Sequence, residues 1–134
     1  DADYRAAIES LVLTCAPPIL AAGYSFGAAT ALRVALADTR VGPLVLVAPP
    51  VAMLADLDLD KLRGPVHVIA GSRDEFAPAE ELARVLEPLP HAHLDVIPRV
   101  DHFFSASGLA ELSELVRQAG QHCAEQVSRV PARA

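Results

Sequence analysis

The sequence of 134 residues carries a net charge of −6 at pH 7, and 52% of its residues are hydrophobic. This length and apolar content predict one domain with a core of its own over residues 1–134. The acidic balance and the scattered arginines exclude a nucleic-acid partner, because phosphate binding needs clustered Lys and Arg.

Cysteine use and apolar runs bear on where the protein works. Cys15 and Cys123 lie far apart and outside any C-x-x-C pair, so we expect no disulfide framework and a cytoplasmic location. The longest apolar stretch, residues 41–55, is interrupted by three prolines and predicts no membrane span. Because the sequence begins at Asp1 rather than at methionine, the lack of an apolar leader does not exclude a signal peptide.

Strand and helix patterns alternate along the chain and are separated by short turn signals. In chain order the predicted elements are a helix over 1–15, a strand over 19–23, a helix over 26–37, a strand over 43–48, a strand over 66–71, a helix over 78–87, a strand over 92–98 and a helix over 109–127. Residues 43–48 are apolar throughout, which is typical of a parallel strand covered on both faces. This alternation predicts an α/β fold, a doubly wound parallel sheet between two layers of helices.

A parallel sheet gathers the loops that follow its strands at one edge, where ligands bind. The four loops are 23–26, 49–52, 72–77 and 99–104. They carry Ser25, Asp74 and His102, which we therefore expect to lie close together. A serine hydroxyl becomes a nucleophile when a base lies beside it and an acid orients that base. Ser25, His102 and Asp74 provide one residue for each of these roles.

The pentapeptide Gly23-Tyr24-Ser25-Phe26-Gly27 joins the strand over 19–23 to the helix that follows. A sharp turn there lifts the Ser25 hydroxyl clear of the sheet in a strained backbone conformation. We expect side chains at positions 23 and 27 to collide with the neighbouring strand and helix, which explains both glycines. The amide of Phe26 is the expected first oxyanion donor, because the first N–H groups of a helix are unpaired.

The segments "GYSFG", "GSRDEFAP" and "VDHFF" resemble the serine, acid and histidine segments of the α/β-hydrolase superfamily, in the same chain order. The longer pattern G-[YF]-S-F-G-A-x-x-A-L-R, followed by L-V-L-V-A-P-P-V and D-H-F-F, is similar to a group of small, mostly uncharacterised bacterial hydrolases of this fold. The resemblance implies that Ser25 is the nucleophile, Asp74 the acid and His102 the base.

The resemblance covers nearly the whole chain but only the second half of the family's fold. In the family, earlier strands and a loop with the second oxyanion donor precede this region. At about 30 residues per βα unit, these N-terminal strands amount to roughly 70–90 residues. The sequence is therefore either part of a longer protein or a reduced relative.

Two other acids compete with Asp74. Asp74 by itself is better explained as a turn residue or as the cap of the helix near Pro78, and only its place in the third of the four loops favours the role of acid. Glu75 lies next to it, and Asp56 follows the strand over 43–48, a position from which some family members draw the acid. All three stay open at this stage.

His102 is the best placed of the five histidines. His67 falls inside a predicted strand, where we expect a packed or edge side chain. His91 and His93 precede a strand at the far edge of the sheet, and His122 lies on a solvated part of the last helix. None of these four is expected to reach the edge that carries Ser25.

The sequence predicts no metal and no cofactor. Residues 56–61 resemble a calcium loop but lack its glycine at the sixth place and its acid at the twelfth, and a solvated acidic connection explains them better. The pair His122-Cys123 has no companion ligands at zinc spacing. The glycines around Ser25 form neither a dinucleotide fingerprint nor a P-loop.

Two classes of function remain. The first is a serine hydrolase that cleaves small ester, thioester or related acyl substrates through an acyl-enzyme. An acyltransferase or a peptidase would use the same three residues. The second class is a catalytically silent binding module of the same fold, favoured by the missing oxyanion loop. The connection over 49–64 is too short for a lid domain, which predicts an open pocket and a small-molecule acyl substrate. The charge and the apolar pattern described above predict no nucleic-acid or membrane partner.

Overall fold

The computed structural model describes residues 2–105 and 107–129. Its centre is a four-stranded sheet in the order β1-β2-β3-β4, in which every neighbouring pair is parallel. The strands are β1 (Ile19–Tyr24), β2 (Val41–Val47), β3 (Val66–Gly71) and β4 (Ala92–Ile97). The helices are α1 (Ala2–Leu11), α2 (Phe26–Ala37), α3 (Ala79–Leu86) and α4 (Ser107–Arg129).

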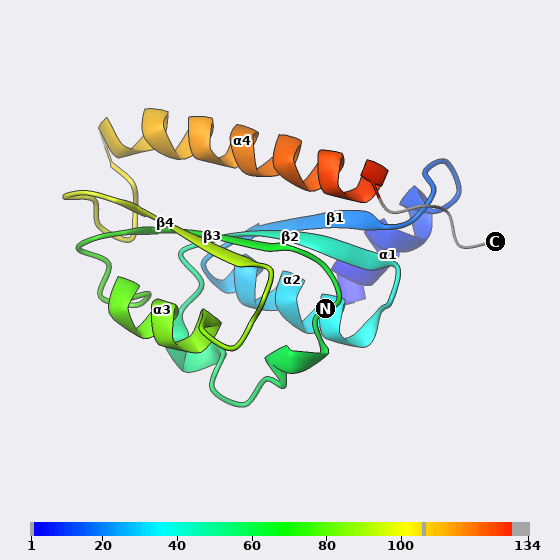
Figure 1. Cartoon of the computed structure of the whole chain (residues 1–134), viewed down its shortest axis with the longest axis horizontal. Helices are drawn as coiled ribbons and strands as arrows, with labels where there is room; N and C mark the ends of the chain where they lie inside the picture. The colour runs from blue at the N-terminus through cyan, green and yellow to red at the C-terminus, as the bar shows by residue number, and fades with distance from the viewer. Residues whose placement is uncertain (1, 106, 130–134) are drawn as a thin grey trace.

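The helices cover both faces of the sheet. Figure 1 shows α4 along one face, with α2 and α3 on the other. Two short 3₁₀ turns, η1 (Val51–Met53) and η2 (Leu59–Lys61), lie in the connection from β2 to β3. This is the doubly wound α/β arrangement expected from the sequence, and each predicted strand and helix is present. None of the helices within the described residues is long and apolar enough to cross a membrane.

The ends of α1, β2 and α4 differ by two residues or more from the sequence-based expectation, and those of β1, α3 and β4 differ by one. Helix α1 ends at Leu11 instead of residue 15, because the amides of Thr14 and Cys15 both turn back to the Leu11 carbonyl before the prolines that follow. Strand β2 begins at Val41, and α4 begins at Ser107. Helix α4 also continues through Gly120, where a Cβ would meet no atom of the described residues within 4 Å.

The core lies on both faces of the two central strands. In β2 every residue except Gly42 is buried, which confirms the prediction of a strand covered on both sides. In β3 only His67 is part-exposed. The edge strand β4 is buried fully at Ile97 alone, because its outer side has no neighbouring strand among the described residues.

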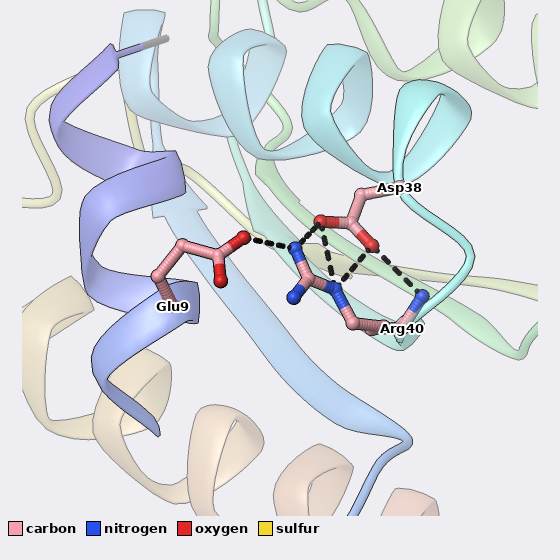
Figure 2. A network of polar contacts seen from close by, with 3 residues as sticks. All are labelled: Glu9, Asp38 and Arg40. Carbon is pink, nitrogen blue, oxygen red and sulfur yellow. Dashed lines mark hydrogen bonds and ion pairs between the residues drawn. The ribbon is translucent and has the colours of Figure 1, made fainter. Parts of the chain in front are cut away.

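An ion-pair network ties α1 to the turn between α2 and β2. Figure 2 shows the Arg40 guanidinium between the carboxylates of Glu9 and Asp38. Arg40 Nε lies 2.9 and 3.2 Å from the two Asp38 oxygens, and the Arg40 amide donates to Oδ1 at 3.0 Å. These hydrogen bonds lower the pKa of Asp38 to about 2.

Candidate active site

Ser25 lies at the turn between β1 and α2, at the edge where the strands end. Its φ of 52° and ψ of −119° are a conformation that side-chain-bearing residues rarely adopt, as expected for a sharp turn from strand to helix. Two contacts hold this backbone: the Ser25 amide donates to the Val47 carbonyl at 2.8 Å, and the Ser25 carbonyl accepts from the Ala28 amide at 3.0 Å. The strained turn is therefore fixed from both sides.

The two glycines that flank Ser25 have different reasons to be there. A Cβ at Gly23 would lie 2.3 Å from the Gly27 carbonyl oxygen, so position 23 admits no side chain without a backbone shift. The same expectation for Gly27 is wrong. A Cβ there would meet nothing within 4 Å among the described residues, because Gly27 faces outward on the first turn of α2.

Ser25, His102 and Asp74 meet at this edge although they come from three separate loops. The Oγ of Ser25 lies 2.8 Å from His102 Nε2, and His102 Nδ1 lies 2.8 Å from Asp74 Oδ2. The His102 side chain is 10% exposed and the Asp74 side chain is 0% exposed. A hydroxyl, an imidazole and a carboxylate thus form one hydrogen-bonded chain, an arrangement compatible with a catalytic triad.

Asp74 also shapes its own loop. Its Oδ1 accepts hydrogen bonds from the amides of Phe76 and Ala77, each at 2.9 Å, while Oδ2 faces His102. The turn-residue interpretation and the histidine-partner interpretation are therefore both correct for this side chain. The two rival carboxylates, those of Glu75 and Asp56, belong to exposed residues.

The Phe26 amide lies directly beside Ser25 as the first N–H of α2. Amides in this position have no carbonyl partner within their own helix, so they can donate to a ligand. The positive end of the helix dipole lies at the same point and favours a negative charge. The local structure therefore fits an anionic oxygen held near Ser25 Oγ.

Exposed aromatic side chains lie around the imidazole, and their rings were not among the predicted site groups. The rings of Phe76 and Phe103 have centroids 4.9 and 5.6 Å from the His102 ring. These two side chains are 58% and 73% exposed, and that of Phe26 is 65% exposed. A sequence signal existed: the chain has four Phe, two Tyr and no Trp, and all of them except Tyr4 lie within two residues of Ser25, Asp74 or His102.

The other four histidines line a cavity of about 560 Å³ where β3 and β4 begin, away from Ser25. His67, on β3, is half-buried, and its pKa is lowered by burial and by the charges of His93 and His122. His122 is exposed, as expected. His91 precedes β4 as predicted, but the same placement is wrong for His93, which lies within β4 and is exposed there because the edge strand is incompletely covered.

Comparison with solved structures identifies the fold as that of the α/β hydrolases. An α/β serine hydrolase homologue from Coxiella burnetii is 27% identical, covering 75% of this chain and 48% of that one, with a TM-score of 0.61. An α/β serine hydrolase without a lid from Xanthomonas campestris is 29% identical over 86% of this chain and 49% of that one, at a TM-score of 0.54. A dienelactone hydrolase from Anabaena variabilis is 23% identical over 79% and 50%, at a TM-score of 0.68.

The chain therefore spans about half the length of these hydrolases. No family model and no curated protein matches its sequence. All three solved structures are described as hydrolases or as a hydrolase homologue, and what they show for this chain is the fold.

Proposed function

We propose that the protein is a serine hydrolase that cleaves small ester, thioester or related acyl substrates through a covalent acyl-enzyme. Ser25 is the nucleophile, His102 the general base and Asp74 the residue that orients the base. The observation that carries this proposal is the chain of two 2.8 Å contacts from Ser25 Oγ through the His102 ring to Asp74 Oδ2.

In the first step, Ser25 Oγ bonds to the acyl carbon while its proton passes to His102 Nε2. The carbonyl oxygen becomes an oxyanion, to which the Phe26 amide can donate a hydrogen bond. The tetrahedral carbon then expels the alcohol or thiol, which takes the proton from Nε2. In the second step, water loses a proton to Nε2 and adds to the acyl carbon, and Ser25 Oγ leaves with that proton.

Asp74 keeps the imidazole in the tautomer that this sequence needs. A carboxylate at Nδ1 favours an N–H on that nitrogen, which leaves the lone pair of Nε2 free for the serine proton. The amides of Phe76 and Ala77 hold the carboxylate in place through its other oxygen. The carboxylate also stabilises the imidazolium that forms when Nε2 takes the proton.

The surroundings of Ser25 favour an uncharged substrate. The exposed rings of Phe26, Phe76 and Phe103 offer apolar contact beside the reactive atoms. Residues 49–64 form only the two 3₁₀ turns η1 and η2, a connection without room for a lid domain. We therefore propose an open site for small acyl groups, and an acyltransferase or a peptidase would use the same three residues.

We also propose that the protein works in the cytoplasm and is one of the small bacterial hydrolases with the G-Y-S-F-G motif. The thiols of Cys15 and Cys123 are both free, which supports a reducing compartment. The similarity to the serine hydrolases of Coxiella burnetii and Xanthomonas campestris supports the second statement.

A fluorophosphonate probe tests the proposed function, because it reacts only with an activated serine. We expect mass spectrometry to place the adduct on Ser25 and to find Ser72 and Ser105 unmodified. Ser25→Ala should abolish labelling. Ser72 is a matched internal control, since its Oγ is also hydrogen-bonded, as an acceptor from the Arg99 amide at 2.7 Å, but to no imidazole among the described residues. A folded chain that stays unlabelled would favour a catalytically silent binding module.

A further inference from the structure

We propose that Tyr24 is a positioning residue that fixes His102 relative to Ser25. The Tyr24 hydroxyl donates a hydrogen bond of 2.8 Å to the backbone carbonyl of His102, 78 residues away in the sequence. This inference rests on the proposed function, because the distance that Tyr24 would fix is the one between the nucleophile and its base.

Two consecutive residues at the end of β1 hold the same histidine at two points. Tyr24 Oη contacts the His102 backbone, and Ser25 Oγ contacts the His102 ring at Nε2, each at 2.8 Å. The peptide bond between Tyr24 and Ser25 links the two contacts on one side, and the His102 residue links them on the other. The hydrogen bond from Tyr24 therefore fixes the His102 backbone relative to the residue that precedes the nucleophile.

The Tyr24 ring also contacts the histidine loop. It stacks on the His102 imidazole with centroids 5.6 Å apart and an interplanar angle of 30°, and it meets Phe104 edge-on at 6.2 Å. Yet Tyr24 is 46% exposed, so packing in the core does not explain why a tyrosine occupies this position. Burial and the charges of Asp74 and Asp101 raise the pKa of Tyr24, which keeps its hydroxyl protonated as a donor.

The loop that carries His102 needs such a support. It belongs to no helix or strand, and two of its non-glycine residues have left-handed backbones, Arg99 with φ of 63° and Phe104 with φ of 51°. Its described backbone contacts include the Arg73 amide to the Val100 carbonyl at 2.9 Å and the Phe104 amide to the Asp101 carbonyl at 3.4 Å. The Tyr24 bond is the contact that acts on the His102 carbonyl itself.

Tyr24→Phe tests this role because it removes the hydroxyl and keeps the ring. The reaction to follow is fluorophosphonate labelling, in which Ser25 Oγ bonds to phosphorus, fluoride leaves and the serine proton passes to His102. We expect the labelling rate constant to fall about tenfold, the effect of losing one such hydrogen bond from the reactive arrangement. The downfield proton resonance of His102 Nδ1–H against Asp74 should broaden at the same time.

Tyr4→Phe is the matched control. The Tyr4 hydroxyl donates an equivalent bond of 2.9 Å to the Ala22 carbonyl, on the same strand but between α1 and β1. Its loss should leave both the labelling rate and the His102 resonance unchanged, whatever it does to the unfolding temperature. A Tyr24→Phe chain that labels at the wild-type rate with an unchanged resonance would overturn the proposal. Equal slowing in both variants would also overturn it, because that result would indicate a general loss of stability.

The His102 Nδ1–H resonance allows the role of Tyr24 to be tested even if the proposed function is wrong. If the wild-type chain is not labelled at all, the hydrolase proposal fails, but the proton between His102 and Asp74 still reports the position of the ring. A resonance that changes in Tyr24→Phe and not in Tyr4→Phe would then still support positioning by Tyr24. One that is unchanged in both variants would reject it.

Discussion

His67 and His93 face each other across the pair β3 and β4, with their ring centroids 5.4 Å apart. The ring of His122, from α4, has its centroid 5.2 Å from that of His67. Burial, followed by the charges of His93 and His122, lowers the pKa of His67, and Asp95 acts weakly in the opposite direction. Burial, together with the two neighbouring imidazoles, therefore disfavours a proton on His67 in the folded protein.

We expect the protein to lose stability as the pH falls below about 6.5, the reference pKa of histidine in the unfolded chain. In that range the unfolded state binds a proton at His67 that the folded state does not, so the free energy of unfolding decreases until the lower folded-state pKa is reached. His67→Asn should flatten this dependence in urea titrations at several pH values, whereas His91→Asn should not. The same slope in wild type and His67→Asn would contradict the assignment.

This effect is separable from that of the carboxylates. The pKa values of Asp38 and Glu114 are lowered to about 2 by their arginine partners. Their contribution to stability is therefore present above the unfolded pKa values, about 4, and is lost only as the pH falls below them. We therefore assign a decline between pH 6.5 and 5 to His67.

The two elbow glycines give a second prediction. Gly23→Ala should destabilise the fold by about 3 kcal/mol or more, because its Cβ would overlap the Gly27 carbonyl. Gly27→Ala should be tolerated and can stabilise α2 by about 0.5 to 1 kcal/mol, since alanine favours helices and its Cβ meets nothing within 4 Å in the described part of the chain. Thermal unfolding of the two variants distinguishes these cases. A loss at Gly27 as large as that at Gly23 would show that position 27 is sterically restricted after all.

Asp74→Asn should lower turnover by a factor on the order of 10⁴ while the chain stays folded. The amide oxygen can still accept from Phe76 and Ala77, but the amide NH₂ would face His102 Nδ1 and stabilise the wrong tautomer. Glu75→Gln and Asp56→Asn are the controls, because each removes a nearby negative charge from an exposed residue. Esterase turnover and circular dichroism would be measured together. If Asp56→Asn lowered turnover strongly and Asp74→Asn lowered it only slightly, the acid of the triad would be Asp56, in the loop after β2.

The exposed phenylalanines lead to a prediction about the acyl group. Each methylene that moves from water onto apolar surface contributes up to about 0.8 kcal/mol, or about fourfold in kcat/KM. We expect p-nitrophenyl butanoate to be preferred over the acetate, and Phe76→Ala or Phe103→Ala to reduce that preference. Leu13→Ala is the control, because this side chain is 83% exposed and precedes β1 at the opposite edge. A preference that survives both phenylalanine substitutions would place the acyl group elsewhere.

The sequence predicts the architecture well because its signals are local. The apolar run of β2, the proline before α3 and the alanine-rich pattern of α2 each define an element without tertiary information. The convergence of Ser25, Asp74 and His102 also follows from the sequence, since parallel strands bring their following loops to one edge. Chain order and strand direction are enough to predict that these three residues lie together.

The remaining features depend on distances between remote segments. The bond from Tyr24 to the His102 carbonyl joins residues 78 positions apart and has no local signal. Whether position 27 can hold a side chain depends on which residues pack against that side of α2, and the pentapeptide alone does not indicate this. The placement of His93 before the last strand disagreed with the predicted strand over 92–98, and the structure agrees with the strand.

The most direct test of the central claim is detection of the acyl-enzyme itself. The chain would be mixed with p-nitrophenyl acetate, quenched in acid and analysed by intact-mass and peptide mass spectrometry. Our account predicts one acetyl group on Ser25, absent in Ser25→Ala and strongly reduced in His102→Ala, where the serine has lost its base. A folded wild-type chain with no acetyl group on Ser25, or with the same modification in Ser25→Ala, would contradict it.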